Sequence, residues 1–246
     1  MNLLRRITPR VLILQLAGNA ILAAIASVWL EIPDSHTWQL LLSVVIAIAL
    51  IAAFLWLHTI TLRILRQPLT VITLWFSSIL LAAWLLLTKA FTTAIAHLDD
   101  NSSQRAGYWN SKLSPHWRNI FTYERLDTWQ TNLTQFVLWV ILPAIVLPFL
   151  IETVTTGLRA PAWRNAARTL QRWQHWLTVL LVSIAGRSIT NHLIDWHPTD
   201  TIHGELISAA LRLPLAYVLA VLLALIVLTV TAVLLGRANT QRNAVP

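Results

Sequence analysis

The sequence predicts an all-α integral membrane protein: a polytopic bundle of six transmembrane helices that forms a single domain over residues 1–246. Hydrophobic residues make up 57% of the chain, against about 45–50% in soluble domains, and charged residues 11% against about 25%. Several stretches of about 20 residues contain no Asp, Glu, Lys or Arg, which is long enough to cross about 30 Å of hydrocarbon. Tryptophans recur at the ends of these stretches, as in the aromatic belts of membrane proteins.

Five uncharged stretches are the clearest predicted spans: residues 11–30, 38–57, 69–88, 133–151 and 213–235. In the first of them, Gln15, Gly18 and Asn19 share one helix face because they are spaced i, i+3 and i+4. In lipid such a face is expected to pack against another helix, with the glycine allowing close approach and the amides bonding across. Whether residues 1–26 are cleaved as a signal peptide stays open, although the apolar run exceeds the ~7–15 residues of a signal peptide's apolar region.

The third and fourth spans flank residues 89–132, the long polar segment of the chain, which is predicted to be an outer loop. Within it, Ser114 followed by Pro115 predicts the start of a short helix. This helix would lie either in the headgroup region or simply exposed to water. Pro143 and Pro148 fall inside the fourth span, where each removes a backbone donor and predicts a bend.

The sixth predicted span, residues 176–196, is less apolar than the others because it contains Arg187, His192 and Asp195. Trp176 and Trp196 bracket it at about 30 Å, the separation expected of the two aromatic belts. The arginine-rich segment before it, residues 152–175, is predicted to be an amphipathic extension of this span that places its arginines among anionic headgroups.

The charges of the loops predict that both termini are cytoplasmic. With this orientation the inner segments hold 11 of the 18 basic residues and one of the 10 acids, Glu152. An excess of arginine on the inside is the usual pattern of polytopic proteins. The net charge of +8 is explained in this way, so no nucleic-acid partner is expected. The expected partners are the lipid bilayer and other membrane subunits, and the expected location is the plasma (inner) membrane.

A group of polar residues in and after the sixth span is the candidate binding site. Ser183, Arg187, Asn191 and Asp195 recur every four residues and form one stripe along the helix. An arginine near mid-membrane is costly unless it has a partner, so this stripe is expected to face the protein interior. The proposed binding residues are Arg187, Asn191, His192, Asp195, Glu205 and Arg212.

Two kinds of metal centre are compatible with the histidines, but neither matches an established metal-binding sequence motif. His192, His197 and His203 would offer imidazole ligands to zinc or iron, with nearby carboxylates. A solvated outer rim is the commoner role of such residues. Haem between His58 and His175 is the other alternative, although histidines at span ends are more often interfacial. The chain is therefore expected to carry no cofactor.

Three classes of function remain open. The first is a small transporter, or a membrane component of a transport or assembly complex, with its site around Arg187. The second is a non-catalytic structural or anchoring membrane subunit, in which polar residues only hold helices together. The third is a membrane enzyme with an outward-facing His/Asp/Glu metal centre. The sequence contains no glycine-rich phosphate loop or nucleophile elbow, so the enzyme is the least favoured class.

Overall fold

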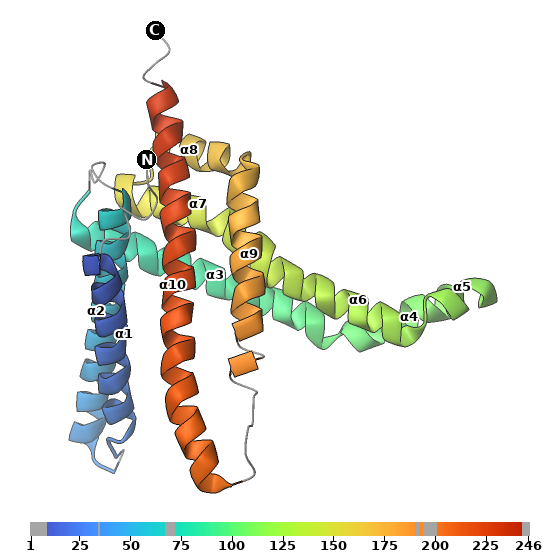
Figure 1. Cartoon of the computed structure of the whole chain (residues 1–246), viewed down its shortest axis with the longest axis horizontal. Helices are drawn as coiled ribbons and strands as arrows, with labels where there is room; N and C mark the ends of the chain where they lie inside the picture. The colour runs from blue at the N-terminus through green and yellow to red at the C-terminus, as the bar shows by residue number, and fades with distance from the viewer. Residues whose placement is uncertain (1–8, 34, 67–71, 190–191, 194–200, 243–246) are drawn as a thin grey trace. The chain divides into compact units, whose positions relative to one another are not determined.

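The protein is built from α-helices, one of which contains a π-helical turn (Figure 1). The structure is a computed structural model and describes residues 9–33, 35–66, 72–189, 192–193 and 201–242. No strand occurs among these residues, in agreement with the predicted all-α class. The helices are α1 (Pro9–Leu30), α2 (Thr37–Arg66), α3 (Leu74–Asp100), α4 (Ser102–Lys112), α5 (Pro115–Ile120), α6 (Tyr123–Phe136), α7 (Leu142–Thr156), α8 (Ala160–Leu170), α9 (Trp173–Ile189) and α10 (Ile202–Arg242).

Among the described residues, five helical stretches are long and apolar enough to cross a membrane, as in a multi-pass membrane protein. They are Pro9–Leu30, Thr37–Arg66, Leu74–Asp100, Tyr123–Thr156 and Gly204–Gly236. In α2, no residue of the most apolar window is buried, so its surface is apolar and open, as contact with lipid requires. The sixth predicted span corresponds to α9, which has 17 residues in the structure. A sixth crossing therefore stays a proposal, as does the orientation of the termini.

The polar segment 89–132 is mostly helical, which differs from the predicted loop. α3 continues to Asp100, and α4, α5 and α6 follow with short breaks. The short helix predicted from Ser114 and Pro115 is confirmed: Ser114 is the N-cap of α5 and Pro115 is its first residue. Polar residues are compatible with helix here because the side chains of the segment are largely exposed to the surroundings. On which side of the membrane the segment lies stays a prediction.

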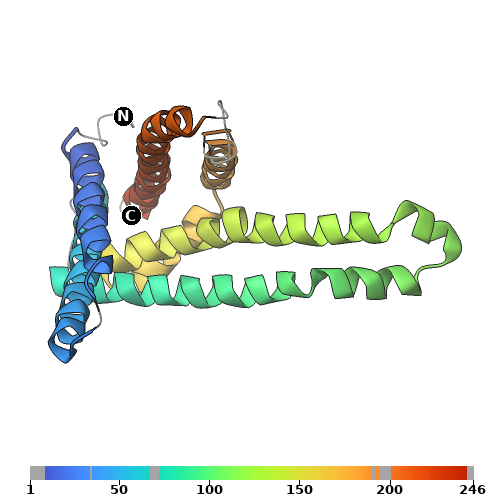
Figure 2. The same ribbon diagram turned by 90° about the horizontal axis from the view of Figure 1, so that it is seen from below.

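The residues cluster into two compact units. Unit 1 contains residues 1–82 and 147–246, and unit 2 contains residues 83–146. Within unit 2, α4 packs against α6, and the two are joined by α5 (Figure 2). The hydroxyl of Ser102 donates to Asp127 Oδ1 at 2.9 Å across this contact. Asp127 therefore holds the two helices of the hairpin together.

Unit 1 is organised around α10, which contacts α1, α2, α8 and α9. Its apolar core joins Val11 of α1, Leu65 of α2 and both Leu225 and Ala232 of α10. The Tyr217 hydroxyl of α10 also donates to the carbonyl of Leu16 in α1, at 2.7 Å. These contacts fix α10 against the first two helices.

The packing predicted for the first span is confirmed in the contact between α1 and α2. Gln15 donates through its side-chain amide to the hydroxyl of Thr61, and Asn19 donates to Gln15 Oε1 at 3.0 Å. Gly18 lies against Leu57: a Cβ at this glycine would be 2.8 Å from both Leu57 methyl carbons. The glycine thus permits the close approach that brings the Gln15 amide within bonding distance of Thr61, while the Asn19 amide bonds within α1.

The fourth predicted span lies in a long helical stretch that is not purely α-helical. A π-helical turn, Val137–Ile141, separates α6 from α7 directly before Pro143, and Pro148 lies inside α7. Because Pro143 has no N–H, the carbonyl four residues before it loses its normal donor, and a π turn is a common way to accommodate such a defect. The predicted bend stays a prediction.

Topology gives a direct test of the membrane arrangement. We expect reporter fusions at Leu158, exposed in the turn between α7 and α8, and at Lys112, at the end of α4, to report opposite sides of the membrane. The physical reason is the excess of basic residues in the predicted inner segments. Paired alkaline phosphatase and fluorescent-protein fusions measure this. The same side for both positions would contradict the arrangement.

Candidate functional site: a buried ion pair

The interior of unit 1 contains an ion pair between Arg66, the last residue of α2, and Glu152 of α7. Both side chains are fully enclosed, with exposed fractions of 2% and 1%. Nε and Nη2 of Arg66 donate to Glu152 Oε2 at 3.0 and 2.8 Å. Two charge-assisted bonds to one oxygen fix the guanidinium firmly against the carboxylate.

A third helix supplies a hydrogen bond to the other oxygen of the carboxylate. Asn165 of α8 donates through Nδ2 to the other carboxylate oxygen, Glu152 Oε1, at 3.0 Å. α10 borders the pair as well, because a Cβ at Gly236 would lie 3.6 Å from Arg66 Nη1. We call Arg66, Glu152 and Asn165 the inner cluster. It joins α2, α7 and α8 next to α10.

The sequence of α8 explains why Asn165 faces inward. Ala162, Asn165, Ala166 and Thr169 are buried and recur at i, i+3, i+4 and i+7, which places them on one helix face. Arg164 and Arg168 are exposed on the other faces. The amphipathic character predicted for residues 152–175 is therefore confirmed for α8. It differs from the prediction in that α8 is a separate helix, which ends at Leu170 before α9 begins at Trp173.

The threonine hydroxyls at the end of α7 bond to carbonyls of their own helix. The Glu152 carboxylate therefore bonds to residues of other helices. The hydroxyls of Thr153 and Thr155 donate to the carbonyls of Phe149 and Ile151, each at 2.7 Å. Gly157 then reverses the chain with a φ of 88°, and its N–H donates to the carbonyl of Thr153 at 2.8 Å. Only glycine adopts this left-handed geometry without strain, so Gly157 permits the sharp turn into α8.

A second buried polar contact joins α9 to α10. His175, in the first turn of α9, and Thr231 are both 0% exposed, and His175 Nδ1 lies 3.3 Å from Thr231 Oγ1. The Thr231 hydroxyl itself donates to the carbonyl of Val227 at 2.8 Å, so its oxygen is left to accept from an N–H at Nδ1. The contact fixes the register of α9 against α10.

The chemistry of the inner cluster is that of a compensated charge. One guanidinium and one carboxylate cancel, and the amide occupies the remaining carboxylate oxygen. Removing either charge would leave the other one buried and uncompensated, which is strongly unfavourable. Ionisable residues within membrane proteins are rare and mark ion or substrate pathways, proton relays or helix contacts. The inner cluster can therefore serve as a contact that breaks when Glu152 changes its partner, which would let the helices move. It can equally serve as a contact that holds the helices together permanently.

The residues that the sequence proposed as the site lie elsewhere in the structure. Arg187 is exposed in the last turn of α9, contrary to the expectation that it faces the interior. His192 is also exposed, with Nδ1 2.9 Å from the carbonyl of Ser188. Glu205 is half-buried in the first turn of α10 and Arg212 is 8% exposed. Asn191 and Asp195 lie outside the described residues, so the grouping itself stays a prediction.

The proposed metal ligands are not tested by the structure. His197 and the side chain of His203 lie outside the described part, and no group of three or more His, Cys, Asp or Glu side chains gathers within it. The two histidines proposed for haem each have a contact within the protein. His175 faces Thr231, and the ring of His58 packs at a tilt against that of Phe54, with its Nδ1 3.0 Å from the Phe54 carbonyl.

The inner cluster is not apparent from the sequence, because Arg66 and Glu152 flank separate predicted spans. Glu152 directly follows the fourth predicted span and is the single acid among the inner segments. An isolated acid among many arginines was the available signal for an internal pair. The chain matches no known family, no curated protein and no solved structure in comparisons with each. The assignment of the inner cluster as a candidate site is therefore based on the structure of this chain alone.

Proposed function

We propose that the protein is a small transporter, or the membrane component of a transport complex, whose inner cluster is the element that switches during transport. The observation that carries the proposal is the fully enclosed Arg66–Glu152 pair, with Asn165 of a third helix on the same carboxylate. A buried pair costs more in desolvation than an apolar contact of the same size, so its presence calls for a role beyond packing. An exchange of partners by Glu152 would move α2, α7 and α8 relative to one another.

The outer polar group remains part of this proposal. Arg187, Asn191, His192, Asp195, Glu205 and Arg212 would form the opposite, outward entrance, since α9 joins the two regions: it begins at Trp173, near His175, and ends beyond Arg187. The proposed location is the inner membrane, with both termini in the cytoplasm. In secondary transporters a central binding site is generally accessible first from one side of the membrane and then from the other.

A second candidate is the anchoring subunit, and one observation favours it. Every carboxylate oxygen of Glu152 already has a donor, and Arg66 uses two of its nitrogens on the same oxygen. Such saturation also suits a permanent tie between helices. The two candidates differ in whether the interior near the cluster ever becomes accessible from both sides of the membrane.

Cysteine accessibility separates the two candidates because the natural chain contains no cysteine. The test variant is Thr155→Cys, a near-isosteric change at a 0% exposed position one turn from Glu152. A membrane-impermeant maleimide is applied to sealed vesicles of either orientation. We expect labelling from both faces, and the ratio of the two rates to change about threefold or more when Glu152→Gln is added, because the neutral side chain weakens the pair.

The matched control is Arg164→Cys, on the exposed face of α8, which is expected to react from one face only and at the same rate in both backgrounds. Labelling of the Thr155→Cys variant from no more than one face, unaffected by Glu152→Gln, would reject the transporter and support the anchoring subunit.

A further inference from the structure

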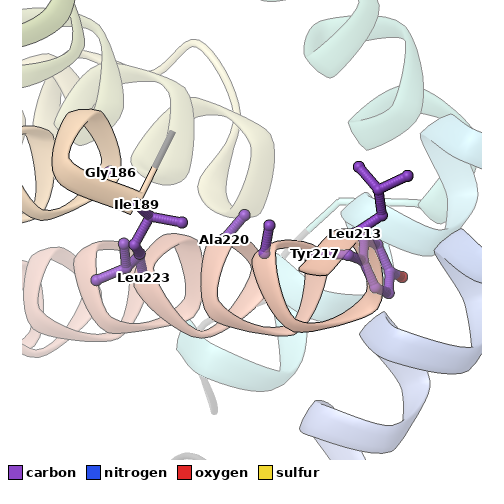
Figure 3. Close-up of a pocket in the computed structure, with 7 residues that line it drawn as sticks. Gly186, Ile189, Leu213, Tyr217, Ala220 and Leu223 are labelled. Carbon is purple, nitrogen blue, oxygen red and sulfur yellow. The ribbon is translucent and has the colours of Figure 1, made fainter. Parts of the chain in front are cut away.

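An apolar cavity of about 280 Å³ lies between α9 and α10 (Figure 3). Small residues create it: Gly186 on α9 faces Ala216 and Ala220 on α10, and a Cβ at Gly186 would meet no atom within 4 Å. Larger side chains form its remaining walls, namely Ile189, Leu213, Tyr217 and Leu223. A dry apolar cavity of about 150 Å³ already accommodates benzene, so this one has room for a longer hydrocarbon.

The lining offers no polar group to an occupant. The one polar side chain among its residues is Tyr217, whose hydroxyl already donates to the carbonyl of Leu16 on α1. Neighbouring apolar side chains on the two helices are open to the surroundings: Ile184 is 58% exposed, and Leu213 is 57% exposed. The cavity lies along the uncharged stretch 213–235 of α10, which belongs to a helix apolar enough to cross the hydrocarbon of a bilayer.

The register of the two helices places an exposed arginine at the same depth as the cavity. Counted from the His175–Thr231 contact, Arg187 is 12 residues along α9 and Arg212 is 19 residues along α10. These separations correspond to about 18 and 28 Å at ~1.5 Å per residue. Arg212 directly precedes the uncharged stretch, so Arg187 lies about 10 Å inside the end of that stretch. A guanidinium there is stabilised by reaching toward an anion at the membrane surface.

We infer that this cavity binds one acyl chain of an anionic glycerophospholipid, whose phosphate pairs with Arg187. The chain fills the space left by Gly186, Ala216 and Ala220, and the headgroup supplies the negative charge that Arg187 requires. Planar, bidentate pairing makes arginine well suited to phosphate. The lipid site shares Arg187 with the outward entrance proposed above, but it uses neither Arg66 nor Glu152, so the lipid experiment and the cysteine experiment can fail separately.

The test is native mass spectrometry of the purified full-length chain, released from micelles supplied with phosphatidylglycerol or with phosphatidylcholine of identical chains. We expect one retained phosphatidylglycerol per chain, bound about tenfold more tightly than phosphatidylcholine. Gly186→Leu occupies the cavity, and its retention of either lipid is expected to fall about tenfold. Arg187→Gln is expected to keep chain binding while losing the preference for the anionic headgroup.

Two matched controls are Gly107→Leu, in α4 of unit 2, and Arg164→Gln, on the exposed face of α8; both are expected to retain lipid as the unaltered chain does. If Gly186→Leu does not give a monodisperse protein, Ala220→Leu replaces it, since Ala220 is exposed at the open side of the cavity. Absence of a retained lipid, equal binding of the two lipids, or undiminished retention by the cavity-filling variant would each overturn the inference.

Discussion

Replacing Arg66 with methionine is expected to destabilise the folded protein by about 3–5 kcal/mol, because Glu152 would remain buried with its charge uncompensated. Methionine is apolar and fills the space along the arginine stem although it is shorter, so most of the loss comes from the charge and its two hydrogen bonds. Equilibrium unfolding in mixed micelles, followed by circular dichroism, measures the change.

The double variant Arg66→Met with Glu152→Met is expected to recover most of that stability, since an apolar pair can replace a buried ion pair at little net cost. Arg164→Met on the exposed face of α8 is the matched control, and we expect it to change stability by less than about 0.5 kcal/mol. A double variant as unstable as the single one would show that the cluster does not act as a pair.

Replacing Gly18 with valine is expected to separate α1 from α2 and to destabilise the protein by about 1–3 kcal/mol, the usual cost of overpacking. A Cβ alone would lie 2.8 Å from two carbons of Leu57, and the branched side chain adds two methyl groups to this clash. The separation also weakens the bond between Gln15 and Thr61. Unfolding in mixed micelles measures the loss.

A compensating change tests the mechanism. Adding Leu57→Ala to Gly18→Val is expected to restore part of the stability, because it removes the two carbons that clash. Gly107→Val in α4 is the control: the nearest atom to a Cβ there is a Tyr123 ring carbon at 4.0 Å, so no overpacking is expected. A Gly18→Val variant as stable as the unaltered chain would contradict close packing at this contact.

Local patterns predicted the features that depend on near neighbours in the sequence. The lack of charge over residues 38–57 predicted α2, and the spacing of Gln15, Gly18 and Asn19 predicted the face that packs against it. Ser114 and Pro115 predicted α5 for the same reason: Pro115 stands at the first helical position, although the Ser114 side chain makes no capping bond. In each case the physical cause lies within a few residues of the effect.

The inner cluster could not be predicted in this way, because its partners come from distant parts of the chain. Arg66 and Glu152 are 86 residues apart, and Asn165 reaches the carboxylate only after Gly157 has reversed the chain. Composition placed both charges at span ends, where single charges are ordinary. Arg187 shows the converse error: its position within an apolar run favoured a buried role, but its side chain is exposed in the structure.

The separation of 86 residues between Arg66 and Glu152 has a consequence for biosynthesis. At a translation speed of ~5–20 residues per second, the ribosome needs about 4–17 s after making Arg66 to supply its acidic partner. During that interval the guanidinium of Arg66 has to stay hydrated at the membrane surface. The hairpin of α1 and α2 therefore exists without the ion pair. The ion pair can form only after α7 has left the translocon. The hydrogen bond from Asn165 of α8 to the carboxylate can form only after that. A nascent chain stopped before Glu152 is therefore expected to leave Arg66 without its acidic partner.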